Sequence, residues 1–203
     1  MRANPTELTP GTEFGAVPEE TERLFAIVLT AVFLLVTVPV MLHHEMWRDE
    51  IQSWLLARDS GSLRSLFHSL HYEGHPSLWY LLLRPIARTV RDPRWIQPIA
   101  LVFSCCSVYL FARFAPFSRL IRVLFAFGYF VVYGWTIVAR SYGIALTLAV
   151  LLCVLLTRPK PRYGAAAIVM ALLANTSVYG SMMVFACVIG LLADALFTAR
   201  SAQ

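Results

Sequence analysis

Long runs without a charged residue dominate the chain. Each of the first four is long enough, or nearly so, to cross a hydrocarbon core about 30 Å thick as one helix. A fifth run is too long for one crossing, and we expect it to turn back near Asn175–Gly180. The runs are Leu24–Leu42, Trp95–Ala112, Val123–Ala139, Ser141–Thr157 and Tyr163–Ala193. This pattern predicts an all-α protein, a polytopic transmembrane helical bundle with about six spans.

Residues 43–94 form a long first loop with a different pattern. Its last part, residues 77–90, contains Arg84 and Arg88, and an arginine in mid-bilayer costs at least ~2.5 kcal/mol. We therefore expect this part to lie in the membrane interface. Before it, apolar residues recur at helical spacing on both sides of a break at Asp59–Ser62. On the first of these helices the expected face contains Ile51, Trp54, Leu55 and Arg58. On the second it contains Leu63, Leu66, Phe67 and Leu70. The loop is thus predicted to hold short amphipathic helices packed on the membrane surface.

Composition agrees with a membrane protein. Hydrophobic residues make up 58% of the chain and charged residues 14%, where a soluble domain carries about 25% charged residues. The net charge of +5 comes mostly from arginines that flank the apolar runs, so we expect no nucleic-acid partner. All four cysteines lie inside apolar runs, and we expect them to be buried small hydrophobic residues, not metal ligands.

The positions of the arginines predict the topology. Residues 113–122 and 158–162 are basic and contain no acid, and a bias of this kind in short connections marks the cytosolic side. Residues 1–23 and 199–203 are then predicted to be cytosolic tails, the first of them disordered, around a transmembrane domain of residues 24–198. The loop 43–94 is then expected outside the cytosol. The membrane is expected to be a plasma membrane, most simply a bacterial inner membrane. Ser60, His68 and Arg91 should face outside, and Ser118 and Lys160 the cytosol.

The loop is also where carboxylate chemistry is expected. After Asp92 the only carboxylate side chain is that of Asp194, near the predicted cytosolic end. Asp49 and Glu50 are adjacent, and adjacent residues of a helix do not share a face. One of them could point into a cavity while the other holds a base, a metal or a neighbour. The alternative is a solvated acidic helix start, stabilised by the helix dipole.

The second half of the loop combines aromatic rings with polar groups. In HYEGHPSLWY, residues 71–80, Glu73 and His75 stand among aromatic side chains, which suits a sugar but is also common at any membrane interface. Arg94 and Arg140 are expected at extracytoplasmic helix ends. Arginine binds phosphate bidentately, so both are candidates for a lipid-linked phosphate, or else for structural ion pairs with Glu73 or Asp92.

Four segments carry a resemblance to a known family. They are WRDEIQSWLLARD (Trp47–Asp59), YEGHPSLWYLLL (Tyr72–Leu83), RWIQPIALVFS (Arg94–Ser104) and ARSYGIALTLAVLL (Ala139–Leu152). In order and spacing they resemble the N-terminal part of the GT-C glycosyltransferases, membrane enzymes that use polyprenyl-phosphate sugars and include the protein O-mannosyltransferases. The likeness is greatest to the bacterial dolichyl-phosphate-mannose mannosyltransferase-like branch, and it extends over most of residues 24–157.

The resemblance implies roles for individual residues. Asp49 matches the catalytic base, Glu50 its neighbour, and His75 a position that lines the donor phosphate. Relatives often carry a second acidic residue where this chain has Tyr142, so no metal ligand is assigned, although a divalent metal stays an open alternative. No other cofactor is expected. The substrate-binding candidates are Trp47, Arg48, Tyr72, Glu73, His75, Arg94, Arg140 and Tyr142.

The expected function is that of a membrane glycosyltransferase, or its N-terminal half. It would move a hexose or pentose from a polyprenyl-phosphate donor, in contact with membrane lipid, to a glycan, lipid or protein acceptor outside the cytosol. Because relatives are usually longer, a non-catalytic truncated membrane protein or scaffold is one alternative. A transporter of lipid-linked sugars is another, although no carboxylate lies deep within a span to relay protons. If a lipid phosphate docks beside the loop, His75, Arg94 and Arg140 should converge near Asp49.

Overall fold

The computed structural model describes residues 18–71, 73 and 75–201, and every regular element in them is helical. The prediction of an all-α class is confirmed for this part of the chain. The α-helices are α1 (Glu19–Leu42), α2 (Arg48–Asp59), α3 (Leu63–Leu70), α4 (Leu78–Thr89), α5 (Ile96–Phe114), α6 (Arg119–Ala126), α7 (Tyr142–Leu156), α8 (Tyr163–Ala174) and α9 (Val178–Ser201). A 3₁₀ turn, η1 (Pro93–Trp95), precedes α5, and a π-helix, η2 (Phe130–Ile137), follows α6.

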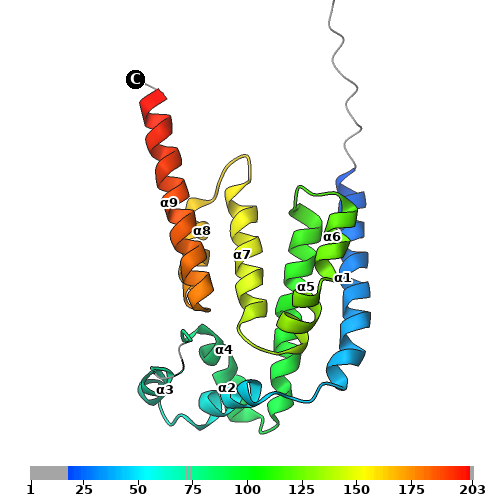
Figure 1. Ribbon diagram of the computed structural model, residues 1–203, viewed down its shortest axis with the longest axis vertical. Coiled ribbons are helices and arrows are strands. Elements are labelled where there is room, and N and C mark those ends of the chain that lie inside the picture. Colours follow the sequence, from blue (N-terminus) through cyan, green and yellow to red (C-terminus); the bar gives the residue numbers. More distant parts are fainter. Residues whose placement is uncertain (1–17, 72, 74, 202–203) are drawn as a thin grey trace, which may run out of the picture.

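The long helices stand side by side and define two ends of the molecule (Figure 1). Helices α2, α3 and α4 lie together at the end that we call the loop end. The described chain begins and finishes at the opposite end, the tail end, where the α5–α6 and α7–α8 connections also lie. Helix α5 packs between α1 and α7, and α8 packs between α7 and α9. The chain therefore runs between the two ends six times, in the order expected from the apolar runs.

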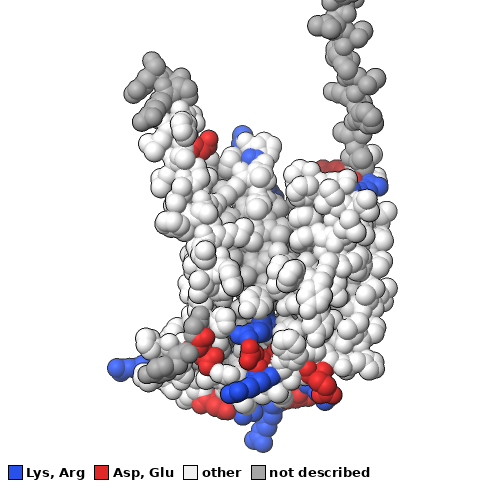
Figure 2. Space-filling model, viewed as in Figure 1, with Lys and Arg blue, Asp and Glu red and all other residues white. Residues whose placement is uncertain are grey.

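An apolar belt separates the two ends. Figure 2 shows that Lys, Arg, Asp and Glu gather at the loop end and, more sparsely, at the tail end of the face in view, with a charge-free zone between them. Four helical stretches are long and apolar enough to cross a membrane, namely Glu19–Leu42, Pro93–Phe114, Arg119–Ile137 and Val178–Thr198. This chain is a helical membrane protein.

Helices α7 and α8 are shorter than the crossings that the sequence predicts. They have 15 and 12 residues, so they reach about 22 and 18 Å along their axes, less than a hydrocarbon core of about 30 Å. Their loop-end termini meet protein: the N–H of Leu78, at the start of α4, donates to the carbonyl of Asn175 in the α8–α9 turn (3.2 Å). The turn itself is tight, because a Cβ on Gly180 would lie 2.3 Å from the carbonyl oxygen of Leu173.

One hydrophobic core joins the loop helices to the bundle. It contains Trp54 of α2, Leu83 of α4, Ala100 of α5, Leu152 of α7 and Leu173 of α8, all of them at most 2% exposed. The loop helices are thus part of the main core and not only a cover on the membrane surface. Arg84 is also buried there, with its guanidinium near the carbonyl oxygen of Ala57 on α2 (3.4 Å).

The residues buried in α2 and α3 differ in part from the apolar faces that the sequence predicts. In α2 the buried residues are Glu50, Ser53, Trp54 and Ala57, whereas Leu55 is exposed. The helix is rotated from the orientation that its apolar residues predict, because the carboxylate of Glu50 finds hydrogen-bond donors inside. In α3 the buried residues are Leu66 and Leu70, and the other two residues of the predicted face, Leu63 and Phe67, are about half exposed.

The predicted span Val123–Ala139 is broken in two. Helix α6 stops at Ala126, Gly128 lies in the turn, and the chain continues as the π-helix η2. In η2 the hydroxyl of Thr136 donates to the carbonyl of Val131 (2.5 Å). π-Helical segments are rare and often lie at functional sites. This one ends at Ile137, so that residues 138–141 are not helical and lead directly into α7 at the loop end.

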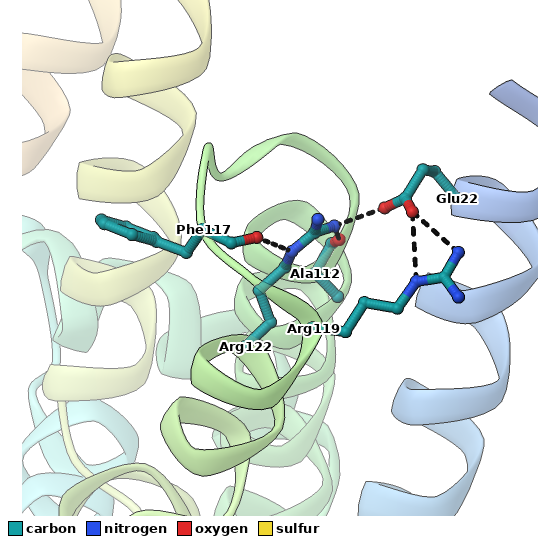
Figure 3. A network of polar contacts seen from close by, with 5 residues as sticks. All are labelled: Glu22, Ala112, Phe117, Arg119 and Arg122. Carbon is teal, nitrogen blue, oxygen red and sulfur yellow. Dashed lines mark hydrogen bonds and ion pairs between the residues drawn. The ribbon is translucent and has the colours of Figure 1, made fainter. Parts of the chain in front are cut away.

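Ion pairs fix the start of α1 to α6 at the tail end. The carboxylate of Glu22 accepts from the guanidinium groups of Arg119 (2.9 Å) and Arg122 (2.6 Å), and Arg122 also donates to the carbonyls of Ala112 and Phe117 (Figure 3). The tail predicted for residues 1–23 is therefore helical from Glu19 onwards, and its part before residue 18 lies outside the described residues. At the other terminus α9 extends to Ser201, into the tail predicted for 199–203.

The two ends can be assigned to the two sides of the membrane by labelling. Ser60 is 8% exposed and donates to the carbonyl of Leu56, so Ser62, which is exposed, is the better position for a cysteine. In a variant without the native cysteines, an impermeant thiol reagent added to intact cells should label positions 62, 68 and 91 and spare 118 and 160. Labelling of 62 and 68 without 91 would show that α4 crosses the membrane.

Candidate functional site

The carboxylate of Glu50 is fully buried and binds three donors. Its Oε2 accepts from the backbone N–H of Trp47 (2.8 Å) and from Nε2 of His44 (3.0 Å). Its Oε1 accepts from the backbone N–H of Ala139 (2.8 Å). Helix α2 is thereby fixed both to the segment that leaves α1 and to the non-helical segment before α7. Non-helical backbone at the edge of a membrane needs such partners, because lipid offers none.

The neighbouring carboxylate, Asp49, points to a different place. Its Oδ2 accepts from Nη1 of Arg140, the residue directly after Ala139. The other terminal nitrogen of Arg140 lies 3.0 Å from Nε2 of His75. The structure thus brings Asp49, Arg140 and His75 together, although 91 positions separate the first two. Asp49 is the open member, with a side chain 56% exposed, whereas that of Arg140 is 16% exposed.

Close packing of α7 on α5 determines where Arg140 lies. A Cβ on Gly143 would stand 3.1 Å from the carbonyl oxygen of Trp135 and 3.2 Å from Oγ of Ser104, so a larger residue would push α7 away. One turn further, Thr147 bonds to the hydroxyl of Ser107 (2.8 Å). Small residues and short polar side chains between helices are typical of membrane proteins.

His75 is held in its neutral form. Burial lowers its pKa below the usual 6.5, and the charge of Arg140 lowers it further, while Glu73 and Asp49 act in the opposite direction. Because Nε2 faces the guanidinium of Arg140, it acts as the acceptor, and the proton of the neutral ring is on Nδ1. That Nδ1 is buried without a hydrogen-bond partner among the described residues, and so is Nε1 of Trp79. Both residues line the same small space, which is closed to water.

Further polar contacts connect the second half of the loop to α2. Oε1 of Glu73 accepts from the side-chain amide of Gln52 (2.5 Å). Burial and the charge of Glu73 raise the pKa of Tyr80 above 10.0, against a hydrogen bond from Ser53, so the phenol remains protonated at neutral pH. Tyr80 and Ser53 line the space beside His75 and Arg140.

The other predicted site residues lie elsewhere at the loop end. Arg94 is exposed and lines a hollow of about 1040 Å³ together with residues 41–46. Its guanidinium has no hydrogen bond or ion pair among the described residues, whereas Asp49, His75 and Arg140 are joined by direct contacts. Trp47 lines a second hollow beside Tyr133, and Arg48 lines a groove between α2 and α3.

Two predicted substrate-binding residues remain. Tyr142 is half-buried in the first turn of α7, two positions after Arg140. Tyr72 lies outside the described residues. Within the described residues no group of three or more His, Cys, Asp or Glu side chains is placed to hold a metal ion. Of the four free cysteines, Cys106 and Cys153 are exposed, in contrast to the buried position that the sequence predicts.

Sequence reasoning missed the partners that complete the site. His44 stands in the same charged stretch as Glu50, six positions before it, and that proximity was a usable signal. Gln52 and Ser53 follow Asp49 at helical spacing, and this spacing was a weaker signal. Ala139 contributes only its backbone N–H, and no property of its side chain could have indicated this.

Comparison with known proteins gives no match for this chain among protein-family models, curated proteins or solved structures. The arguments below therefore rest on the geometry of the site and on the motifs in the sequence.

A Glu50→Gln substitution should destabilise the fold. The amide can place its oxygen toward only one side, and its NH₂ group then faces the backbone N–H of Ala139 or of Trp47. An unsatisfied buried donor costs about 1–3 kcal/mol, so thermal unfolding in detergent should occur at a lower temperature. The control is Glu45→Gln, an exposed carboxylate in the same segment. Equal melting temperatures for the two variants would contradict a structural role for Glu50.

His75 should give the fold a specific pH dependence. Because its pKa is lower in the folded protein than the usual 6.5, the unfolded chain binds more protons between these two values. The stability that depends on neutral His75 is complete above pH 6.5 and is lost as the pH falls toward the folded-state pKa. A His75→Gln variant can still accept from Arg140, and it should lose less melting temperature than the wild type between about pH 7.5 and pH 5, because it has no imidazole to protonate. An unchanged pH profile would contradict this assignment.

Proposed function

We propose that this protein is a membrane glycosyltransferase that takes a sugar from a polyprenyl-phosphate donor. The observation that carries the proposal is the group formed by Asp49, Arg140 and His75. An exposed carboxylate stands beside a partly buried guanidinium at the loop end, directly below an apolar belt. A lipid-linked phosphate is confined to this layer, and the motifs that resemble the GT-C glycosyltransferases supply these three residues.

The roles of the residues follow from their chemistry. The acceptor hydroxyl attacks C1 of the sugar, the bond between C1 and the phosphate oxygen breaks, and polyprenyl phosphate leaves with the electron pair. Asp49 takes the proton of the hydroxyl, which requires it to lie within hydrogen-bond reach of the acceptor. Its exposure leaves room for such an approach. Arg140 and His75 contact the phosphate and stabilise the charge that develops on it.

Glu50 is a positioning residue in this proposal. With no exposed surface and three donors already bound, it has no access to substrate. It acts through its neighbours, because it fixes the start of α2, which carries Asp49, to the segment that carries Arg140. Glu73 borders the same site from the connection before α4, close enough to influence His75, and it is the nearest candidate for a contact to a sugar hydroxyl.

The orientation of the protein is also part of the proposal. The α7–α8 connection and the tail-end turns of α5 and α6 carry six cations, Arg113, Arg119, Arg122, Arg158, Lys160 and Arg162, which favours the cytosolic side for that end. Transfer then takes place outside the cytosol, in a plasma membrane. Arg94 and the hollow beside it are placed at the same outer surface and remain candidates for binding the donor or the acceptor.

Replacement of Asp49 by Asn tests the reaction. The purified protein in lipid nanodiscs is supplied with a panel of polyprenyl-phosphate hexoses and pentoses and with candidate acceptors, and sugar transfer is followed by mass spectrometry. General-base catalysis contributes about 10²–10⁴-fold, so Asp49→Asn should lower transfer by at least about 100-fold. The control is Asp59→Asn at the other end of α2, where the carboxylate pairs with the adjacent Arg58.

Two outcomes would contradict the proposal. Transfer by the Asp49→Asn variant at the wild-type rate would exclude Asp49 as the base. Movement of a labelled lipid-linked sugar across proteoliposomes by the wild-type protein, without any transfer, would instead favour a transporter.

A further inference from the structure

We infer that Asp49 occupies the phosphate-binding position of Arg140 in the resting state, and that the donor phosphate displaces it. This inference rests on the proposed function and concerns the regulation of the same site. The expected base is then masked by an ion pair until an anionic lipid has bound. Asp49 thus fills the anion-binding position of Arg140 before the substrate arrives, and binding of the substrate phosphate releases it.

The geometry distinguishes the fixed partner from the replaceable one. Arg140 follows Ala139, whose N–H is held by buried Glu50, and its guanidinium is mostly buried. The side chain of Asp49 is mostly exposed, and among the residues that the structure describes its hydrogen-bond partner is Arg140. Exposed ion pairs contribute only about 0–1 kcal/mol, so the carboxylate can be exchanged for another anion at small cost. The backbone of Arg140 then stays in place, and its guanidinium presents its fork to the new ligand.

The donors around Arg140 outnumber the acceptors that face them. Nδ1 of His75 and Nε1 of Trp79 are both buried without a hydrogen-bond partner in the described part of the chain, and the two residues border one closed space together with Arg140. Buried donors without acceptors are rare in proteins and call for a specific explanation. A carboxylate has two oxygens, and in this position it meets only Arg140. A phosphate group has more acceptor oxygens and a larger negative charge, so it fits this surplus of donors better than Asp49 does.

The space beside His75 is too small for a water molecule in the described structure. Access to the two free donors therefore requires Arg140 or the segment after His75 to move. Entry of a phosphate beside Arg140 would supply the driving force, because charge-assisted bonds are about twice as strong as neutral ones. The released carboxylate then lies next to the bound phosphate, where an acceptor hydroxyl must approach. Donor binding is thus expected to precede productive acceptor binding.

Anion affinity tests this inference without any sugar transfer. The full chain in nanodiscs is titrated with farnesyl phosphate, a short prenyl phosphate without sugar, and binding is followed by calorimetry. If Asp49 competes for Arg140, Asp49→Asn should bind farnesyl phosphate about two- to fivefold more tightly than the wild type. Arg140→Ala should bind it about tenfold more weakly or worse. Asp59→Asn, which removes the same charge at the other end of α2, should leave the affinity unchanged.

Further variants and ligands identify the cause. Asp49→Ser also removes the charge and should give the same tightening, and it replaces Asp49→Asn if that variant fails to fold. Farnesol should bind all variants alike, because it has the same chain and no phosphate. Inorganic phosphate should show the same order of affinities at a higher concentration. An affinity of Asp49→Asn and Asp49→Ser equal to or below that of the wild type would overturn the inference.

The masking of Asp49 and the proposed function can each fail without the other. Tighter farnesyl phosphate binding by Asp49→Asn, with no sugar transfer by the wild type, would support the masked site and end the glycosyltransferase proposal. Sugar transfer that depends on Asp49, with no change of phosphate affinity in Asp49→Asn, would keep the enzyme and end the masking.

Discussion

The buried carboxylate of Glu50 joins parts of the chain that are far apart in sequence. It binds the exit of α1 through His44, the start of α2 through Trp47 and the segment before α7 through Ala139. A charge without exposed surface is tolerated only where donors surround it, and here all three are supplied by protein. The position of Arg140, and with it the candidate site, depends on this carboxylate together with the close packing of α7 on α5.

A second constraint is that α7 and α8 are too short to cross a hydrocarbon core of about 30 Å by themselves. Helices α2 and α4 pack at the loop end of the bundle, where α7 and α8 are too short to complete the crossing. They share with the bundle a core that includes Trp54, Leu83 and Leu152. The site is therefore built where two short helices end on a helical platform. Non-helical backbone at residues 138–141 is possible at this level because the platform supplies its hydrogen-bond partners.

The charged side chains of the candidate site have contrasting surroundings. Two adjacent carboxylates have opposite environments: Glu50 is enclosed by donors, and Asp49 is exposed beside a cation. Arg140 serves both the carboxylate and the neutral His75, so a change in one contact affects the other. Such coupling suits a site that responds to an anionic lipid, because the guanidinium can exchange partners while the backbone of Arg140 stays in place.

The sequence by itself determined the helical membrane class, the limits of the first loop and the break at Asp59–Ser62, where Ser62 caps α3 by accepting from the N–H of Ser65. These features depend on local composition and periodicity, which a single chain displays directly. Only the tertiary structure decided the rotation of α2, the shortness of α7 and α8, and the contacts that join Arg140 to Asp49 and His75. A periodic pattern reports which residues avoid water, but the burial of Glu50 depends on a backbone N–H 89 positions away, and such pairings exist only once the helices have packed.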